Sequence, residues 1–310
     1  MVIINAKIVL IDRVIENGYL IIENNIIKSI HEGKYQGFDS VFDAKGNILM
    51  PGFIDIHTHG IADIDFMNAT VEDYKNIEKY LFNEGVTTFL ATSLTCDKET
   101  LIKVCETAKD AKKVTTTLGG IHLEGPYISK KYKGAQNEEF IRNPNVEEIQ
   151  ALVEKSSNNI KNITLAPELE GSLELIRYLK EKDISVSLGH SDASYIEAKL
   201  AFENGANSIT HTTNGMNKAE GIVEAAKKLP FFSEFIADGV HVNKEVIKEY
   251  FDIILTYKSK SKDHISREEY NLPLTKEAFE SLISKTEGNI ISKTRYYIPL
   301  GKNKEGSELT

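Results

Sequence analysis

Cysteine is scarce in this sequence, with only two among 310 residues. Cys96 and Cys105 lie nine positions apart and form no CxxC spacing. This pattern argues against a disulfide framework and against a thiolate metal site. We therefore expect two free thiols that are buried or partly exposed.

Long apolar runs are also missing from the chain. No stretch approaches the roughly 20 consecutive apolar residues that a membrane span requires. The opening residues, MVIINAKIVLIDRVIENG, lack the basic start and unbroken apolar run of a signal peptide. We expect no membrane partner and a cytoplasmic location.

Positive charge is in deficit, because 37 lysines and arginines face 46 acidic residues and the formal net charge is −9. Such a chain repels phosphate backbones, so we expect no nucleic-acid partner. An anionic small molecule would need a local basic pocket. The length of 310 residues suits one large α/β barrel, or a barrel with a small satellite domain, and the 41% apolar content is ordinary for a globular protein.

The first part of the sequence predicts a small β module over residues 1–48. Apolar and polar positions alternate in short runs between residues 2 and 31. Turn-forming pairs interrupt the runs at Asn17-Gly18 and Asn24-Asn25, so we expect turns at both places.

From Pro51 onward, short apolar runs alternate with longer segments of helical periodicity. This alternation predicts an α/β fold with a TIM-type (β/α) barrel over residues 49–258. The expected strands are FIDIHTH, TTFLATSLT, LGGIHLEGP, ITLAPEL, ISVSLGHSD, SITHTTNG and EFIADGVHV. Residues 259–310 depart from this pattern, so the barrel is predicted to be incomplete at its C-terminal side and to be followed by a divergent tail.

Ionisable side chains stand where the expected strands end. Active sites of TIM barrels are built at the C-terminal ends of their strands, so these side chains should converge. In the FIDIHTH run the two histidines are two positions apart, which sends both to the same side of a strand. The residues are His57, His59, Glu124, His190, His211 and His241.

Imidazole and carboxylate ligands in this number suit zinc, iron or manganese. A divalent ion in such a site activates water and polarises a carbonyl group, which fits the hydrolysis of an amide at neutral pH. The alternative for any single histidine is a satisfied core or surface residue.

Six longer motifs carry a family resemblance: PGFIDIHTHG, GIHLEGPYI, LAPE, LGHSDA, HTTNGM and IADGVHV. Over about residues 1–250 the chain resembles the N-acetylglucosamine-6-phosphate deacetylases of the amidohydrolase superfamily. The resemblance implies a metal-dependent barrel beside a small β domain. It also implies one or two divalent ions, zinc or iron, and removal of acetate from an amino sugar phosphate in amino-sugar catabolism. Members commonly form homodimers.

The resemblance assigns roles to individual positions. Glu124, His190 and His211 become the principal metal ligands, and His57 and His59 imply a second ion. The positions that meet the sugar phosphate or its acetamido group are Ala135, Asn214, Gly215 and His241.

The sequence departs from the family pattern at three places. Gln136 stands where many members have a histidine that touches substrate, and Ala219 replaces a phosphate-binding arginine. The family's catalytic aspartate ends the next strand, for which residues 252–257 are the candidate here. Neither Asp252 nor Asp263 falls in register, so the catalytic residue is unknown.

These departures leave two alternatives open beside a deacetylase of N-acetylglucosamine 6-phosphate. One is a degenerate or truncated homologue that binds metal or an amino sugar without turning it over. The other is an amidohydrolase that acts on a different N-acylated small molecule, because the arginine that would bind phosphate is missing.

Overall fold

The computed structural model describes residues 1–10, 13–236, 240–250 and the backbone of 296–298. The chain folds into two compact units, and the boundary between them falls between Gly52 and Phe53. The domain bounds at 48 and 258 stay predictions. The candidate eighth strand at 252–257, with Asp252 and Asp263, and the tail at 259–310 lie outside the described residues.

The N-terminal unit is a small sheet with strand order β3-β2-β1-β4, and β5 also pairs with β1. Its core is small and apolar, formed by Ala6, Ile8, Ile15 and Ala44. The strands are β1 (Val2–Val9), β2 (Val14–Glu23), β3 (Ile26–Glu32), β4 (Val41–Asp43) and β5 (Ile48–Leu49). The predicted β module is confirmed.

One of the two predicted turns in this module is wrong. Gly18 lies inside β2, where it pairs with Ala6 on one side and Glu32 on the other. A Cβ at this position would lie 2.6 Å from the carbonyl oxygen of His31, so glycine permits close strand packing here. The turn at Asn24-Asn25 is confirmed, with φ of 52° and 63°.

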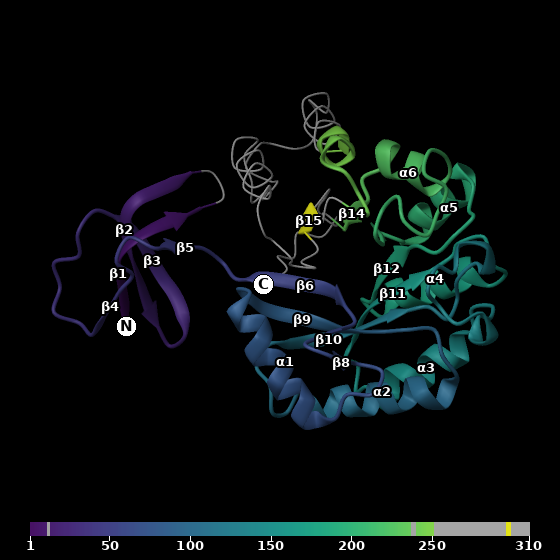
Figure 1. Cartoon of the computed structure of the whole chain (residues 1–310), viewed down its shortest axis with the longest axis horizontal. Coiled ribbons are helices and arrows are strands. Elements are labelled where there is room, and N and C mark those ends of the chain that lie inside the picture. The colour runs from purple at the N-terminus through teal and green to yellow at the C-terminus, as the bar shows by residue number, and fades with distance from the viewer. Residues whose placement is uncertain (11–12, 237–239, 251–295, 299–310) are drawn as a thin grey trace. The chain divides into compact units, whose positions relative to one another are not determined.

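The second unit contains a curved eight-stranded sheet in the order β15-β14-β13-β12-β11-β10-β9-β6 (Figure 1). All seven strands predicted for the barrel are present and parallel, and β15 is antiparallel to β14. The fold class is therefore confirmed. The strands are β6 (Phe53–Thr58), β9 (Val86–Ser93), β10 (Leu118–Glu124), β11 (Ile160–Leu165), β12 (Ser185–Leu188), β13 (Ser208–Ile209), β14 (Phe232–Phe235) and β15 (Tyr296–Ile298).

Helices alternate with these strands, and Figure 1 shows α1, α2 and α3 along the outer face of the curved sheet. They are α1 (Val71–Asn83), α2 (Lys98–Ala111), α3 (Val146–Lys155), α4 (Ser172–Glu181), α5 (Tyr195–Asn204) and α6 (Ile222–Lys228). Capping boxes at Thr70/Asp73 and Ser194/Glu197 satisfy the first N–H groups of α1 and α5. Among the described residues, no helix is both long and apolar enough to span a membrane.

Smaller elements complete the connections. After β6 come β7 (Gly60–Ile61) and β8 (Ile64–Asp65), which form a short antiparallel hairpin. Between β10 and α3 lie the 3-10 turns η1 (Lys130–Tyr132) and η2 (Glu138–Phe140). Cys96 and Cys105 are buried and free, as predicted, and burial raises the pKa of both thiols to about 12.

A polar layer crosses the interior of the barrel. His122 Nε2 lies 2.7 Å from the hydroxyl of Thr164, which lies 2.7 Å from the hydroxyl of Thr210. Thr210 in turn donates to Ser187 at 2.6 Å. Each of these four buried side chains has a hydrogen-bond partner, so none of the contacting polar atoms is left unsatisfied. The contacts connect β10, β11, β12 and the end of β13.

Candidate metal centre

The five side chains predicted as metal ligands meet around one carboxylate. Glu124 is the last residue of β10, and His57 lies on β6 with His59 just beyond it. His190 lies two residues after the end of β12, and His211 lies two residues after the end of β13. Two groups of suitable ligand atoms result, His57–His59–Glu124 and Glu124–His190–His211, and both use Glu124.

The second group has the spacing of a tetrahedral site. Nε2 of His190 lies 3.3 Å from Oε1 of Glu124, and Nε2 of His211 lies 3.1 Å from the same oxygen. The two nitrogens are 3.0 Å apart. Ligand atoms 2.0–2.1 Å from a tetrahedral zinc ion lie about 3.3 Å from one another. These three atoms could therefore hold one ion with little movement.

The first group uses both oxygens of the same carboxylate. Nε2 of His57 is 3.1 Å from Oε1 of Glu124, and Nε2 of His59 is 3.1 Å from Oε2. The side chain of His59 is 29% exposed, whereas His57 is fully buried. Solvent can therefore reach the centre from the His59 side.

The outer nitrogens of two of these histidines face backbone carbonyl oxygens. Nδ1 of His59 lies 3.3 Å from the carbonyl oxygen of Thr92, and Nδ1 of His190 lies 2.8 Å from that of Tyr132. A carbonyl oxygen only accepts, so each Nδ1 can keep a proton there and leave Nε2 available to bind an ion. Burial lowers the pKa of His211 and so favours its neutral form as well. A divalent ion could therefore lie between these nitrogens and the carboxylate and be bound by both.

The carboxylate itself is ionised. Burial alone raises the pKa of Glu124, but its contacts with His57, His190 and His211 outweigh burial and hold the pKa well below its usual value. The centre thus offers one buried negative charge and four imidazoles, which is a hard and borderline ligand set for a divalent metal.

Strained backbone presents two of the histidines. His190 has φ of 46° and His211 has φ of 32°, in the left-handed region that residues other than glycine seldom adopt. Glu168 of the LAPE motif fixes the loop after His190, because its carboxylate accepts 2.6 Å hydrogen bonds from the Ser191 hydroxyl and the Asp192 N–H. Such backbone strain persists only where surrounding contacts stabilise the conformation, as the hydrogen bonds of Glu168 do after His190.

The residues predicted to contact substrate occupy different settings. Ala135 is exposed in the loop after β10, and His241 is exposed beyond β14. Asn214 and Gly215 lie three and four residues after His211, and the Gly215 carbonyl accepts from Ser191 N–H at 3.1 Å. Their role in substrate binding stays a prediction.

Gly215 has a second role that the structure makes visible. A Cβ there would lie 3.0 Å from Nδ1 of His190 and 3.3 Å from Cε1 of His211, at a φ of +61°. We expect Gly215→Ala to displace both imidazoles and lower zinc affinity by about 10–100-fold, as loss of ligand orientation does elsewhere. Equilibrium zinc binding against a chelator measures this.

Gly46→Ala is the matched control for Gly215→Ala. Gly46 has a similar φ of +79°, but a Cβ there would meet nothing within 4 Å. This variant carries comparable backbone strain without crowding a ligand. Equal zinc affinities for Gly215→Ala and Gly46→Ala would contradict the expectation that a Cβ at position 215 weakens zinc binding by crowding the histidines.

Gln136 contacts the metal centre directly. Its Nε2 donates to Oε2 of Glu124 at 2.8 Å, while its Oε1 accepts from Thr95 N–H at 2.7 Å. The side chain is buried, so both ends of its amide are fixed. Gln136, at which this sequence departs from the family pattern, therefore positions the carboxylate of Glu124.

The sequence prediction missed Glu234 and His122. Glu234 on β14 is buried, with Oε1 2.7 Å from Nδ1 of His57. His122 is buried next to His57, at 4.6 Å between ring centroids, and burial holds its pKa well below the usual value. A signal existed for both. Glu234 is a charge inside an apolar strand, and His122 precedes Glu124 by two positions on the same strand.

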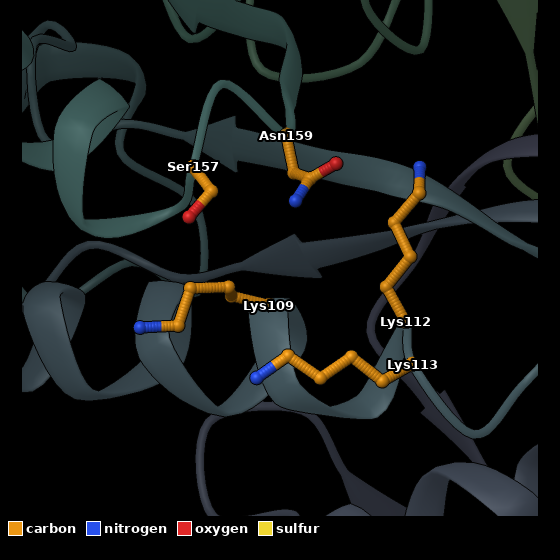
Figure 2. Close-up of a pocket in the computed structure, with 5 residues that line it drawn as sticks. All are labelled: Lys109, Lys112, Lys113, Ser157 and Asn159. Atoms are coloured by element: carbon orange, nitrogen blue, oxygen red, sulfur yellow. The ribbon is translucent and has the colours of Figure 1, made fainter.

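A shallow basic pocket lies at the other end of the barrel. Figure 2 shows Lys109, Lys112 and Lys113 of the α2 end beside Ser157 and Asn159, which precede β11. Lys112 donates to the Gly119 carbonyl at 2.9 Å, and Lys113 pairs with Asp110 at 2.7 Å. Two of the three ammonium groups are thus already engaged within the protein, and we assign no function to this pocket.

Known proteins share this architecture. The sequence profile of the amidohydrolase family matches residues 48–294. N-acetylglucosamine-6-phosphate deacetylase of Vibrio furnissii is 39% identical over 208 residues, which is 64% of this chain and 52% of that protein. N-acetylgalactosamine-6-phosphate deacetylase of Escherichia coli O157:H7 is 33% identical over 213 residues, 66% of this chain and 56% of that protein.

A solved structure agrees with these relatives. The crystal structure of N-acetylglucosamine-6-phosphate deacetylase from Thermotoga maritima matches with a TM-score of 0.70 and 35% identity, covering 82% of this chain and 67% of that one. The chain spans little more than half the length of the two curated relatives. Because the family profile matches most of its residues, the chain belongs to the amidohydrolase family.

Proposed function

We propose that this chain is a metal-dependent deacetylase of N-acetylglucosamine 6-phosphate in amino-sugar catabolism. The observation that carries the proposal is the convergence of four imidazole Nε2 atoms on the oxygens of Glu124, at 3.1–3.3 Å. Family membership favours hydrolysis, and the relatives that carry deacetylase names suggest the substrate class.

The roles of the ligand residues follow from the geometry. Glu124, His190 and His211 would hold the principal ion, and His57 and His59 with Glu124 would hold a second. Zinc and iron both suit this set. Such an ion supplies activation of water and polarisation of the acetamido carbonyl. The protein's part is to keep the lone pairs aimed inward, through the outer acceptors and Gln136.

The overall reaction adds water across the amide and yields an amine and acetate, so the amine must gain a proton. We assign this proton transfer to none of the described residues. The strand candidate at 252–257 lies outside them.

The choice of sugar and the need for phosphate belong to the proposal as well. One relative is named for the glucosamine substrate and another for its galactosamine epimer. Lys218 and Ala219 are exposed in the loop after β13, where the family pattern has a phosphate-binding arginine. We propose that phosphate still contributes, with Ala135, Asn214, Gly215 and His241 near the sugar.

A cytoplasmic location and a homodimer are part of the same proposal. Two buried free thiols suit a reducing compartment. A phosphorylated sugar does not cross a membrane unaided, which places its hydrolase on the side where the sugar phosphate is made.

The test combines metal analysis with turnover. Purified full-length protein is assayed for bound zinc and iron and for acetate release from three sugars: N-acetylglucosamine 6-phosphate, its galactosamine epimer and unphosphorylated N-acetylglucosamine. Release that depends on metal and is fastest with the first sugar is expected. Metal binding without acetate release from any sugar would instead favour a degenerate homologue, and fastest release from the unphosphorylated sugar would refute the phosphate assignment.

A further inference from the structure

Glu234 is a buried acid in the barrel interior that the ligand set does not include. It lies on β14, and its side chain is only 4% exposed. A charged carboxylate in such a place requires a partner. Its Oε1 lies 2.7 Å from Nδ1 of His57, whose side chain is fully buried.

This contact bears on the tautomer of His57. A carboxylate beside Nδ1 favours the tautomer with its proton on Nδ1, which leaves the lone pair on Nε2. That Nε2 lies 3.1 Å from Oε1 of Glu124. With the proton on the other nitrogen, His57 could not bind a metal ion through Nε2.

Glu234 differs from the acceptors of the other histidines. His59 and His190 direct Nδ1 at neutral backbone carbonyls, those of Thr92 and Tyr132. A carboxylate partner orients an imidazole more strongly and makes it a more basic ligand. Among these three, His57 is the histidine with a charged outer acceptor.

We propose that Glu234 is a positioning residue that fixes the tautomer and ring orientation of His57, and that it thereby sets the affinity of the His57–His59–Glu124 group for its ion. The inference rests on the proposed metal centre. It assigns Glu234 no contact with substrate.

Zinc affinity tests the proposal on the full-length protein. In competition with a chelator, Glu234→Leu should bind one ion about 10–100-fold more weakly than wild type. Glu234→Gln retains an oxygen acceptor and should recover part of this loss. Ser233→Ala, on the same strand but directed to the opposite face, should bind zinc as wild type does.

A double-mutant cycle separates positioning from general damage to the fold. His57→Ala alone should weaken the same ion, and His57→Ala/Glu234→Leu should be no worse than His57→Ala, because Glu234 acts through His57. Losses that simply add would overturn the proposal, and so would wild-type affinity in Glu234→Leu. If the leucine variant fails to fold, Glu234→Gln takes its place in the cycle with the same expectation.

The controls keep this inference separate from the proposed function. Wild-type protein that binds no metal would refute the metal centre itself. Wild-type protein that binds metal, beside a Glu234→Leu protein that binds it equally well, would overturn only the role of Glu234.

Discussion

Replacing Glu124 with glutamine is expected to abolish both metal binding and acetate release. The glutamine keeps the shape of the side chain but removes the buried charge that all four imidazoles face. Loss of outer partners alone costs about 10–100-fold in metal affinity, so loss of the shared ligand should exceed 100-fold. Bound zinc and acetate release are the two measurements.

The control for this variant is Glu78→Gln. Glu78 is also a carboxylate with several hydrogen bonds, accepting from Thr116 and Thr117, but it lies away from the metal centre. Its metal content should equal that of the wild type. A Glu124→Gln protein that retained a full complement of zinc would contradict the assignment of Glu124 as the central ligand.

Replacing Arg142 with methionine is expected to lower the free energy of unfolding more than any other substitution proposed here. The guanidinium binds both oxygens of Glu148 and donates to the carbonyls of Cys96, at 2.9 Å, and Phe140, at 2.8 Å. Removal leaves Glu148 buried without its counter-charge. Breaking a buried pair costs about 3–5 kcal/mol, and we expect about 2–3 kcal/mol because Arg142 is 29% exposed. Denaturant unfolding measures the change.

A second substitution sharpens this prediction. In Arg142→Met/Glu148→Leu no charge remains buried, so much of the lost stability should return. Lys113→Met, which breaks the exposed pair with Asp110, should leave stability unchanged. If the double variant were less stable than Arg142→Met, an unpaired Glu148 could not be the cause of the loss.

The elements of the fold could be predicted from local sequence because their signals are local. Apolar runs ending in polar residues mark the seven barrel strands, and the segment from Val71 to Asn83 carries both a helical period and a capping box. The turn predicted at Asn17-Gly18 is wrong because contacts with distant residues decide the conformation there. Pairing of Gly18 with two neighbouring strands overrides the preference of an Asn-Gly pair.

The metal centre was predictable only in part. Ligands at strand ends could be listed because barrel topology brings those ends together. The contact of Glu234 with His57 joins the two distant strands β14 and β6, and that of Gln136 with Glu124 joins a strand end to the loop that follows it. Such contacts depend on side-chain direction and packing, which spacing within one segment does not encode.

The pair His57–Glu234 also bears on the order in which the protein can assemble. It joins the first parallel strand of the barrel, β6, to the last, β14, and no described backbone ladder pairs those two strands. At about 5–20 residues per second, a ribosome needs roughly 10 seconds or more to extend the chain from residue 57 to residue 234. During that time His57 is already synthesised but lacks its acceptor. Until β14 has been synthesised, the His57–His59–Glu124 group therefore lacks the outer carboxylate that we propose for His57.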